Sequence, residues 1–228
     1  MQAIHYYFIR HGETEANQNK LAGQEKVQGW TDTPLTRVGR AQMADLADHF
    51  KNIPLDLAYS SDMPRSQTSA QILLSSQPQS LIATPLKEFR EIYYGGMEGQ
   101  PIEVAWPESL QEMVHHMREE GIPQSQFVPN VIDGSSHRDP EGLAEDFMTF
   151  WNRLESGMMQ VHDEALEYRL DHMKPEINVA IISHHTPISA FLHEVLADFD
   201  LADVLDYGHY AHVSYHDGFY ELIEWNMS

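Results

Sequence analysis

Short apolar runs alternate with amphipathic segments along this chain. The runs 4–9 and 177–185 are unbroken and rich in β-branched and aromatic residues, which is typical of strands that are buried on both faces. Two weaker runs, 55–62 and 80–85, have the length of strands and are bounded by polar or turn-forming residues. The pattern therefore predicts four strands distributed along the chain.

Three segments carry apolar residues every three or four positions, as in a helix with one buried face. They are 35–52, 63–76 and 185–199. Each follows a predicted strand or a polar loop. In the third segment we expect Thr186 to be the N-cap and Pro187 to occupy the first helical position, where its missing N–H costs nothing.

Strands that alternate with helices predict a three-layer α/β/α sandwich with a mainly parallel central sheet. The tail, 211–225, predicts a hairpin around its Asp-Gly turn. Residues 100–145 interrupt the alternation with prolines and glycines around one helical piece, 108–120. We expect a single domain over 1–228, with 100–145 inserted as a cap that covers one end of the sheet.

The composition narrows the class of protein. The 228 residues carry 14 Lys and Arg against 35 Asp and Glu, a formal net charge of −21. Nucleic acid and anionic membranes bind through excess Lys and Arg, so neither is an expected partner. There are no cysteines, and no apolar run approaches the roughly 18 residues of a membrane span. No signal-peptide pattern is seen at the start of the chain. We expect a cytoplasmic protein.

Candidate chemistry lies at the ends of the predicted strands. Arg10 and His11 end the first strand, the segment 60–65 follows the second, and Ser-His-His at 183–185 follows the fourth. A further segment, 88–99, carries two glutamates ahead of a glycine-containing turn. In open α/β sheets, ligands bind at the carboxyl ends of the strands, so we expect these groups to converge.

Two arginines, two histidines and a carboxylate suit phosphoryl transfer. Arginine binds phosphate oxygens bidentately and stays charged. A neutral imidazole can attack phosphorus, and a carboxylic acid can protonate the leaving oxygen. Arg65 also falls in the first turn of its predicted helix, where free backbone N–H groups favour an anion.

Several sequence motifs strengthen this interpretation. The chain contains RHGETEAN followed by GWTDTPLTRVGRAQ, then SSDMPRSQTS, LKEFREIYYGGMEG and ISHHTPI, in that order. These segments resemble the motifs of the histidine phosphatase superfamily, the phosphoglycerate mutase-like proteins. Their spread covers most of the chain outside 100–145. The resemblance implies the α/β/α fold already predicted from the pattern.

The resemblance also implies roles for individual residues. His11 would be the nucleophile that becomes phosphohistidine. Arg10, Arg65 and His184 would hold the phosphoryl group and stabilise its charge. Glu91 would be the general acid and then the base for the attacking water. No metal and no cofactor are implied, because the arginines and histidines neutralise the phosphoryl oxygens.

Four further residues are expected around the substrate. Asn17, Gly23 and Gln24 would line the phosphate side of the first loop. His185 stands where this branch of the family usually has glycine. Its backbone N–H can still point at the phosphate, while its side chain would either crowd the pocket or add a donor.

Two alternatives concern single side chains. Glu88 competes with Glu91 for the acid role, and we favour Glu91 because its spacing to the following glycine matches the family better. The histidines at 209, 212 and 216 raise the question of a metal site. No carboxylate motif completes a ligand set, so we expect solvated or hydrogen-bonded histidines instead.

The insertion bears on the reaction, because mutases of this family need a second anion site. Nine carboxylates lie in 101–145, namely Glu103, Glu108, Glu112, Glu119, Glu120, Asp133, Asp139, Glu141 and Glu145. Only Arg118 and Arg138 oppose them. We therefore predict a phosphomonoesterase of the histidine acid phosphatase type, acting on a small phosphorylated metabolite with a neutral or partly apolar remainder.

Two other functions stay open at this point. One is a phosphotransferase of the phosphoglycerate mutase type, and the other is a non-catalytic phosphate-binding module on the same fold. A homodimer would be ordinary for the family. If a neutral histidine and a protonated carboxyl act together, we expect an activity optimum at mildly acidic to neutral pH.

Overall fold

The computed structural model describes residues 3–18, 25–196, 199–201 and 203–228. The strands are β1 (Ala3–Arg10), β2 (Leu57–Ser61), β3 (Thr84–Leu86), β4 (Glu176–Ser183), β5 (Tyr210–His216) and β6 (Phe219–Met227). The α-helices are α1 (Arg37–Phe50), α2 (Pro64–Leu74), α3 (Ile102–Ala105), α4 (Glu108–Glu119), α5 (Phe127–Ser136), α6 (Phe147–Asp171) and α7 (His185–Val195). Short 3₁₀ helices are η1 (Glu15–Asn17), η3 (Lys87–Phe89), η4 (Gly95–Met97) and η5 (Gln124–Gln126).

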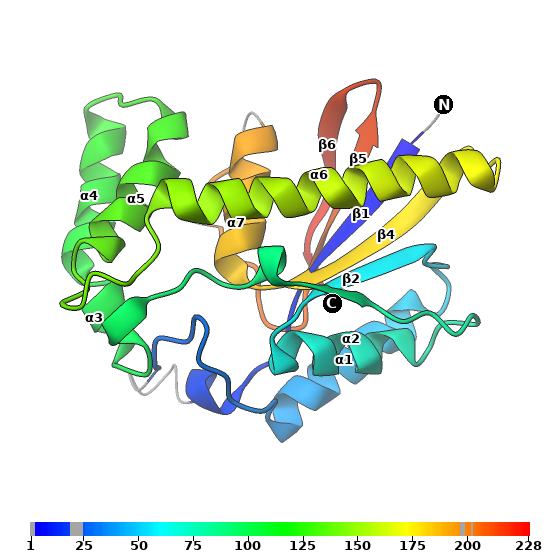
Figure 1. The fold of residues 1–228 in the computed structure, drawn as a ribbon, viewed down its shortest axis with the longest axis horizontal. Coiled ribbons are helices and arrows are strands. Elements are labelled where there is room, and N and C mark those ends of the chain that lie inside the picture. The colour runs from blue at the N-terminus through cyan, green and yellow to red at the C-terminus, as the bar shows by residue number, and fades with distance from the viewer. Residues whose placement is uncertain (1–2, 19–24, 197–198, 202) are drawn as a thin grey trace.

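The strands of the described residues form one six-stranded sheet in the order β3-β2-β4-β1-β5-β6 (Figure 1). β3, β2, β4 and β1 run parallel to one another, and β5 pairs antiparallel with both β1 and β6. The sheet is therefore mainly parallel, as the sequence predicted. Its parallel part brings the carboxyl ends of β1, β2 and β4 to one edge.

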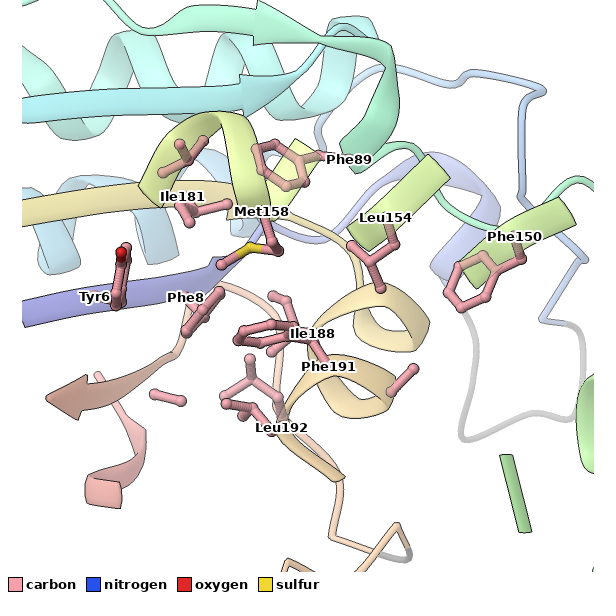
Figure 2. Packing of buried hydrophobic residues seen from close by; sticks show 14 of the residues in the cluster. Tyr6, Phe8, Phe89, Phe150, Leu154, Met158, Ile181, Ile188, Phe191 and Leu192 are labelled. Atoms are coloured by element: carbon pink, nitrogen blue, oxygen red, sulfur yellow. The ribbon is translucent and has the colours of Figure 1, made fainter. Parts of the chain in front are cut away.

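Helices cover both faces of this sheet. Tyr6 and Phe8 of β1 join a core with residues of α6 and α7, whereas Tyr7 and Ile9 join a second core with residues of α1 and α2. This alternation follows from the two-residue period of a strand. Figure 2 shows the first core, where aromatic and aliphatic side chains from β1, α6 and α7 interlock. The three-layer α/β/α prediction is confirmed.

Two predicted elements, α7 and β3, have boundaries that differ from the prediction. The N-cap of α7 is His184 and not Thr186, so Pro187 is the third helical residue, still within the first turn where no N–H is required. The helix ends at Val195, four residues short of the predicted end. β3 covers Thr84–Leu86 instead of 80–85, because it pairs only with the last three residues of β2.

The sequence did not predict α6, the longest helix described. Asp146 caps it by accepting a hydrogen bond from the Thr149 N–H. The buried side chains of α6 recur at helical spacing, at Phe150, Leu154, Met158, Val161 and Ala165. The signal was therefore present as a cap followed by a period of three to four residues, and it was overlooked.

The segment 100–145 forms α3, α4 and α5 beyond the carboxyl edge of the sheet (Figure 1, green). α4 coincides with the expected helical piece. α5 was not predicted, because Pro129 and Gly134 indicated a break. Pro129 is the third residue of α5, where it takes no intrahelical hydrogen bond away. No helix among the described residues is both long enough and apolar enough to cross a membrane.

Candidate active site

The end of β1 is fixed from several sides. The His11 N–H donates to the Ser183 carbonyl of β4, and the Gly12 N–H donates to Ser69 Oγ of α2. A Cβ at Gly12 would lie 2.4 Å from the carbonyl oxygen of Gly39 in α1. Only glycine allows this close approach of the turn to the helix. The His11 side chain is thereby delivered to the carboxyl edge of the sheet in one position.

Hydrogen bonding and burial define the chemical state of the His11 ring. Nδ1 lies 2.8 Å from the Gly12 carbonyl oxygen, to which it donates, so Nε2 keeps its lone pair. The side chain is buried. Burial lowers the pKa of His11 well below 6.5, and the charges of Arg65 and Arg10 lower it further. The ring is therefore a neutral imidazole with a free Nε2.

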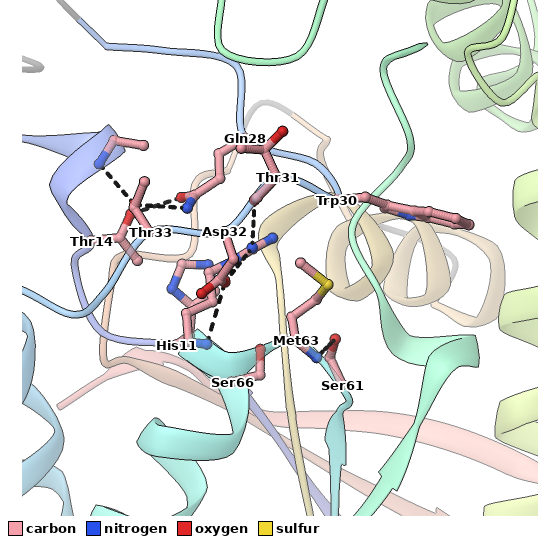
Figure 3. Close-up of polar contacts among 12 residues, drawn as sticks. His11, Thr14, Gln28, Trp30, Thr31, Asp32, Thr33, Ser61, Met63 and Ser66 are labelled. Atoms are coloured by element: carbon pink, nitrogen blue, oxygen red, sulfur yellow. Dashed lines mark hydrogen bonds and ion pairs between the residues drawn. The ribbon is translucent and has the colours of Figure 1, made fainter.

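His184 follows β4 and meets His11 with 5.0 Å between the ring centroids. Arg65 Nε donates to His184 Nδ1 over 3.3 Å, so the ring proton sits on Nε2, which lies 3.4 Å from Ser66 Oγ. Burial lowers the pKa of His184 well below 6.5. Figure 3 shows His11 and Ser66 gathered where α2 begins. His184 is a neutral donor beside the free Nε2 of His11.

Arg65, in the first turn of α2, is 1% exposed. Nη1 donates to Asp32 Oδ1 over 2.9 Å and to the Thr31 carbonyl over 3.1 Å, and Nη2 donates to the Gly29 carbonyl over 2.6 Å. With the bond to His184, four of its five N–H groups have partners within the described residues. One Nη2–H remains for a ligand.

Residues 29–31 form the loop whose carbonyls accept hydrogen bonds from Arg65, and Glu98 fixes this loop in turn. The carboxylate of Glu98 accepts hydrogen bonds from the backbone N–H groups of Gly29, Trp30 and Thr31, and also from Tyr94. The N–H groups of the loop thus face Glu98, whereas carbonyls of the same loop face Arg65. The direction of the Arg65 guanidinium is fixed by this arrangement. Sequence reasoning gave Glu98 no role.

Arg10 is oriented by the segment before β5. Nη1 donates to the Leu205 carbonyl over 2.7 Å, and Cζ lies 3.7 Å from the centroid of the Tyr207 ring. The Tyr207 hydroxyl donates to Glu25, and its ring centroid is 5.8 Å from that of His11. Arg10 Nε is buried without a partner among the described residues. Such a donor suits an oxygen of a bound anion.

Tyr207 belongs to no motif that the sequence analysis used. It reaches Arg10 through the packing of the turn before β5 against the end of β1, where the Gly208 N–H donates to the Arg10 carbonyl. No local pattern indicates such a contact, because the two residues are far apart along the chain. Only the fold reveals this aromatic neighbour of the arginine.

Glu91 reaches the same cluster from the segment after η3. Oε1 accepts a hydrogen bond from the Ile92 N–H over 2.9 Å, and Oε2 accepts one from the Thr186 N–H over 3.3 Å. Burial raises the pKa of Glu91 above 4.5, although these hydrogen bonds partly oppose the shift. Glu88 faces α6 instead, where its Cβ would lie 2.6 Å from a Cβ added at Gly157. The fold brings Glu91 and not Glu88 toward the histidines.

The structure also gives contacts for two other expected site residues, Asn17 and His185. Asn17 is buried in η1, with Oδ1 2.6 Å from Thr14 Oγ1. His185 Nδ1 lies 3.3 Å from Ser189 Oγ, one turn along α7. Two residues fall outside the described part of the chain, namely Gly23 and Gln24.

The histidines that raised the metal question have other partners. His212 Nε2 lies 3.0 Å from His5 Nδ1, and His216 Nε2 lies 3.3 Å from Glu221 Oε2. Among the residues with described placement, no three His, Asp or Glu side chains gather as a metal-binding group.

Comparison with known proteins identifies the family. The model of the histidine phosphatase superfamily (branch 1) matches residues 6–228, nearly the whole chain. The chain therefore belongs to the histidine phosphatase superfamily, as the motifs indicated.

Among curated proteins, the chain is similar to the probable phosphoglycerate mutase GpmB of Yersinia pestis. The two are 30% identical over 131 residues, which cover 56% of this chain. The match spans 58% of the relative's length, somewhat over half of it.

Solved structures share the fold. The phosphoglycerate mutase of Bacillus anthracis str. Sterne superposes with a TM-score of 0.76 at 24% identity, covering 99% of this chain and 94% of the other. A mycobacterial glucosyl-3-phosphoglycerate phosphatase gives a TM-score of 0.70 at 18% identity over the whole of both chains. The alpha-ribazole phosphatase of Shigella flexneri gives 0.67 at 23% identity, covering 97% and 96%. Mutases and phosphatases thus share this architecture, and fold alone does not separate the two activities.

Proposed function

We propose that this protein hydrolyses phosphomonoesters through a phosphohistidine at His11. The observation that carries the proposal is the buried His11 ring, neutral and with Nε2 free, placed beside two arginines and a second histidine. This arrangement supplies a nucleophile together with fixed positive charge where the phosphoryl group would sit.

In the first step, His11 Nε2 attacks the phosphorus of the substrate. A P–N bond forms, and the P–O bond to the alcohol breaks. Glu91, in its acid form, gives its proton to the departing oxygen, so the alcohol leaves uncharged. Arg10, Arg65 and His184 donate to the phosphoryl oxygens, whose charge spreads in the transition state.

In the second step, a water molecule attacks the phosphohistidine. The Glu91 carboxylate takes one proton from that water as the P–O bond forms. The P–N bond breaks, and its electron pair returns to His11 Nε2 while inorganic phosphate leaves. Burial raises the pKa of Glu91 and so favours the acid form that the first step needs, and this supports the assignment of Glu91 to both roles.

The insertion favours hydrolysis over mutase activity. Its two arginines have protein partners: Arg118 forms an ion pair with Asp200, and Arg138 Nε donates to the Val104 carbonyl. Residues 101–145 contain no lysine to replace them. A second anionic group on the substrate would therefore meet carboxylates. This supports a substrate with one phosphate and a neutral or partly apolar remainder.

The test compares wild type with His11→Ala on an aryl phosphate, alongside a phosphoglycerate mutase assay. We expect hydrolysis by wild type, loss of hydrolysis in the variant, and mutase turnover far below phosphatase turnover. Mutase turnover equal to hydrolysis would contradict the assignment. If wild type and variant both bind phosphate and are equally inert, the protein is a phosphate-binding module instead.

A further inference from the structure

One arginine of α6, Arg153, directs three of its five N–H groups at the backbone around Glu91. Arg153 Nη1 donates to the carbonyls of Glu88 and Arg90, each over 2.9 Å, and Nη2 donates to the carbonyl of Glu91 over 3.1 Å. The predicted acid is thus contacted through its own main chain by a side chain 62 residues away.

Arg153 is in turn locked by Glu145, the last residue of the insertion. Nε donates to Oε1 over 2.9 Å, and Nη2 donates to Oε2 over 2.7 Å, a bidentate pair. The side chains are only 15% and 7% exposed. Glu145 Oε2 also accepts the Tyr93 N–H, and the Glu145 N–H donates to the Tyr93 carbonyl. All five N–H groups of Arg153 therefore have partners.

The segment that carries Glu91 has no secondary structure to fix it. Residues 91–94 lie between η3 and η4 and belong to no strand or helix. On the inner side, the Glu91 carboxyl meets the N–H groups of Ile92 and Thr186. On the outer side, the Glu91 carbonyl receives hydrogen bonds from Arg153 and from Trp30 Nε1. The carboxyl position depends on these contacts, and proton transfer is sensitive to displacements of about 1 Å.

We propose that Arg153, held by Glu145, is the positioning residue that sets Glu91 for proton transfer. Through Glu145, the same pair ties the end of the insertion to the acid. The inference rests on the proposed role of Glu91 as general acid. It is distinct from a purely structural role, because it assigns the effect of Arg153 to the proton-transfer step.

The test uses the dependence of kcat/KM on the leaving group. p-Nitrophenyl phosphate has an acidic leaving group that departs with little protonation, whereas an alkyl phosphate such as glycerol phosphate requires a proton. For Arg153→Met we expect a loss of about 3-fold on the aryl ester and about 30- to 100-fold on the alkyl ester, which is at or below the lower end of what a general acid contributes because Glu91 itself remains. Arg153→Lys keeps the positive charge but loses the planar guanidinium that donates to several acceptors at once, so we expect an intermediate loss of kcat/KM on the alkyl ester.

The matched control is Arg169→Met, on the same helix, whose side chain lies away from the acid beside β5 and its turn. We expect its two rates to equal those of wild type. An equal loss on both esters in Arg153→Met, with thermal unfolding as in the control, would overturn the positioning role. Glu91→Gln separates the two proposals. If Glu91→Gln loses kcat/KM equally on the aryl and the alkyl ester, the acid role of Glu91 is wrong. If Glu91→Gln loses more on the alkyl ester but Arg153→Met loses equally on both, only the positioning role of Arg153 is wrong.

Discussion

The rings of His11 and His184 lie edge to face with 5.0 Å between their centroids, and they are held in opposite tautomers. The Gly12 carbonyl keeps the proton of His11 on Nδ1, whereas Arg65 Nε keeps the proton of His184 on Nε2. Burial lowers the pKa of both rings, so both are neutral at pH 7. One ring therefore presents a lone pair where its neighbour presents an N–H.

This relationship predicts the effect of removing His184. In His184→Ala, the phosphoryl group loses a donor, and Arg65 Nε loses its acceptor. We expect kcat for an aryl phosphate to fall by about 10²- to 10³-fold, as for other lost transition-state donors. His115→Ala, at an exposed position on α4, serves as the control and should be as active as wild type. A kcat unchanged in His184→Ala would remove this residue from the reaction.

The shifted pKa values predict a bell-shaped profile of kcat/KM. The active form has neutral His11, so activity is complete above its pKa, and the lowered pKa places the acid limb well below 6.5. The active form has protonated Glu91, so activity is lost as pH rises through its raised pKa, above 4.5. Glu91→Gln should remove the basic limb. A wild-type profile that stays flat from about pH 5 to pH 9 would contradict this pair.

Asp32 should contribute to stability, because its partner Arg65 is fully buried. In Asp32→Ala, the guanidinium loses its only ion pair among the described contacts and keeps two backbone carbonyls and His184. We expect the free energy of unfolding in urea to fall by about 2 kcal/mol. Asp48→Ala breaks the exposed pair with Lys51 and should cost less than about 1 kcal/mol. Equal losses in the two variants would mean that burial of Arg65 does not matter.

Gly157 of α6 tests how closely this helix packs on the acid segment. Alanine favours a helix by about 1 kcal/mol over glycine, yet its Cβ here would lie 2.6 Å from Glu88 Cβ. We therefore expect Gly157→Ala to lower the thermal unfolding midpoint and to reduce kcat/KM for alkyl phosphates. Ser156→Ala, on the exposed side of the same helix, should change neither. If Gly157→Ala has a raised thermal unfolding midpoint and full activity, the chain around Glu88 moves aside without cost and the close packing does not matter.

The sequence predicted the parts that local patterns encode. The buried strands β1 and β4, the helices α1 and α2, and the hairpin at the C-terminus follow from periodicity and turn residues. The carboxyl edge of a parallel sheet then implied that His11, Arg65 and His184 would meet. Local patterns placed the start of α7 wrongly, because its N-cap is His184, which makes no side-chain capping hydrogen bond and is not a residue type that marks a helix start.

The contacts that orient the site were beyond local patterns. Glu98 supports Arg65 through an intervening loop, and Tyr207 reaches Arg10 from the far end of the chain. Arg153 lies in α6, a helix that the pattern did contain but that was not recognised. Glu98, Tyr207 and Arg153 orient other side chains of the site, and the residues next to them in the sequence do not indicate this role.

A rapid-quench experiment shows directly whether His11 becomes phosphorylated during turnover. The protein is mixed with ³²P-labelled phosphomonoester, denatured in alkali, and examined for acid-labile label by peptide mapping. We expect label on the peptide that contains His11, formed at least as fast as product is released, and absent in His11→Ala. Hydrolysis at the full rate with no label on His11, or with label on another residue, would contradict this expectation.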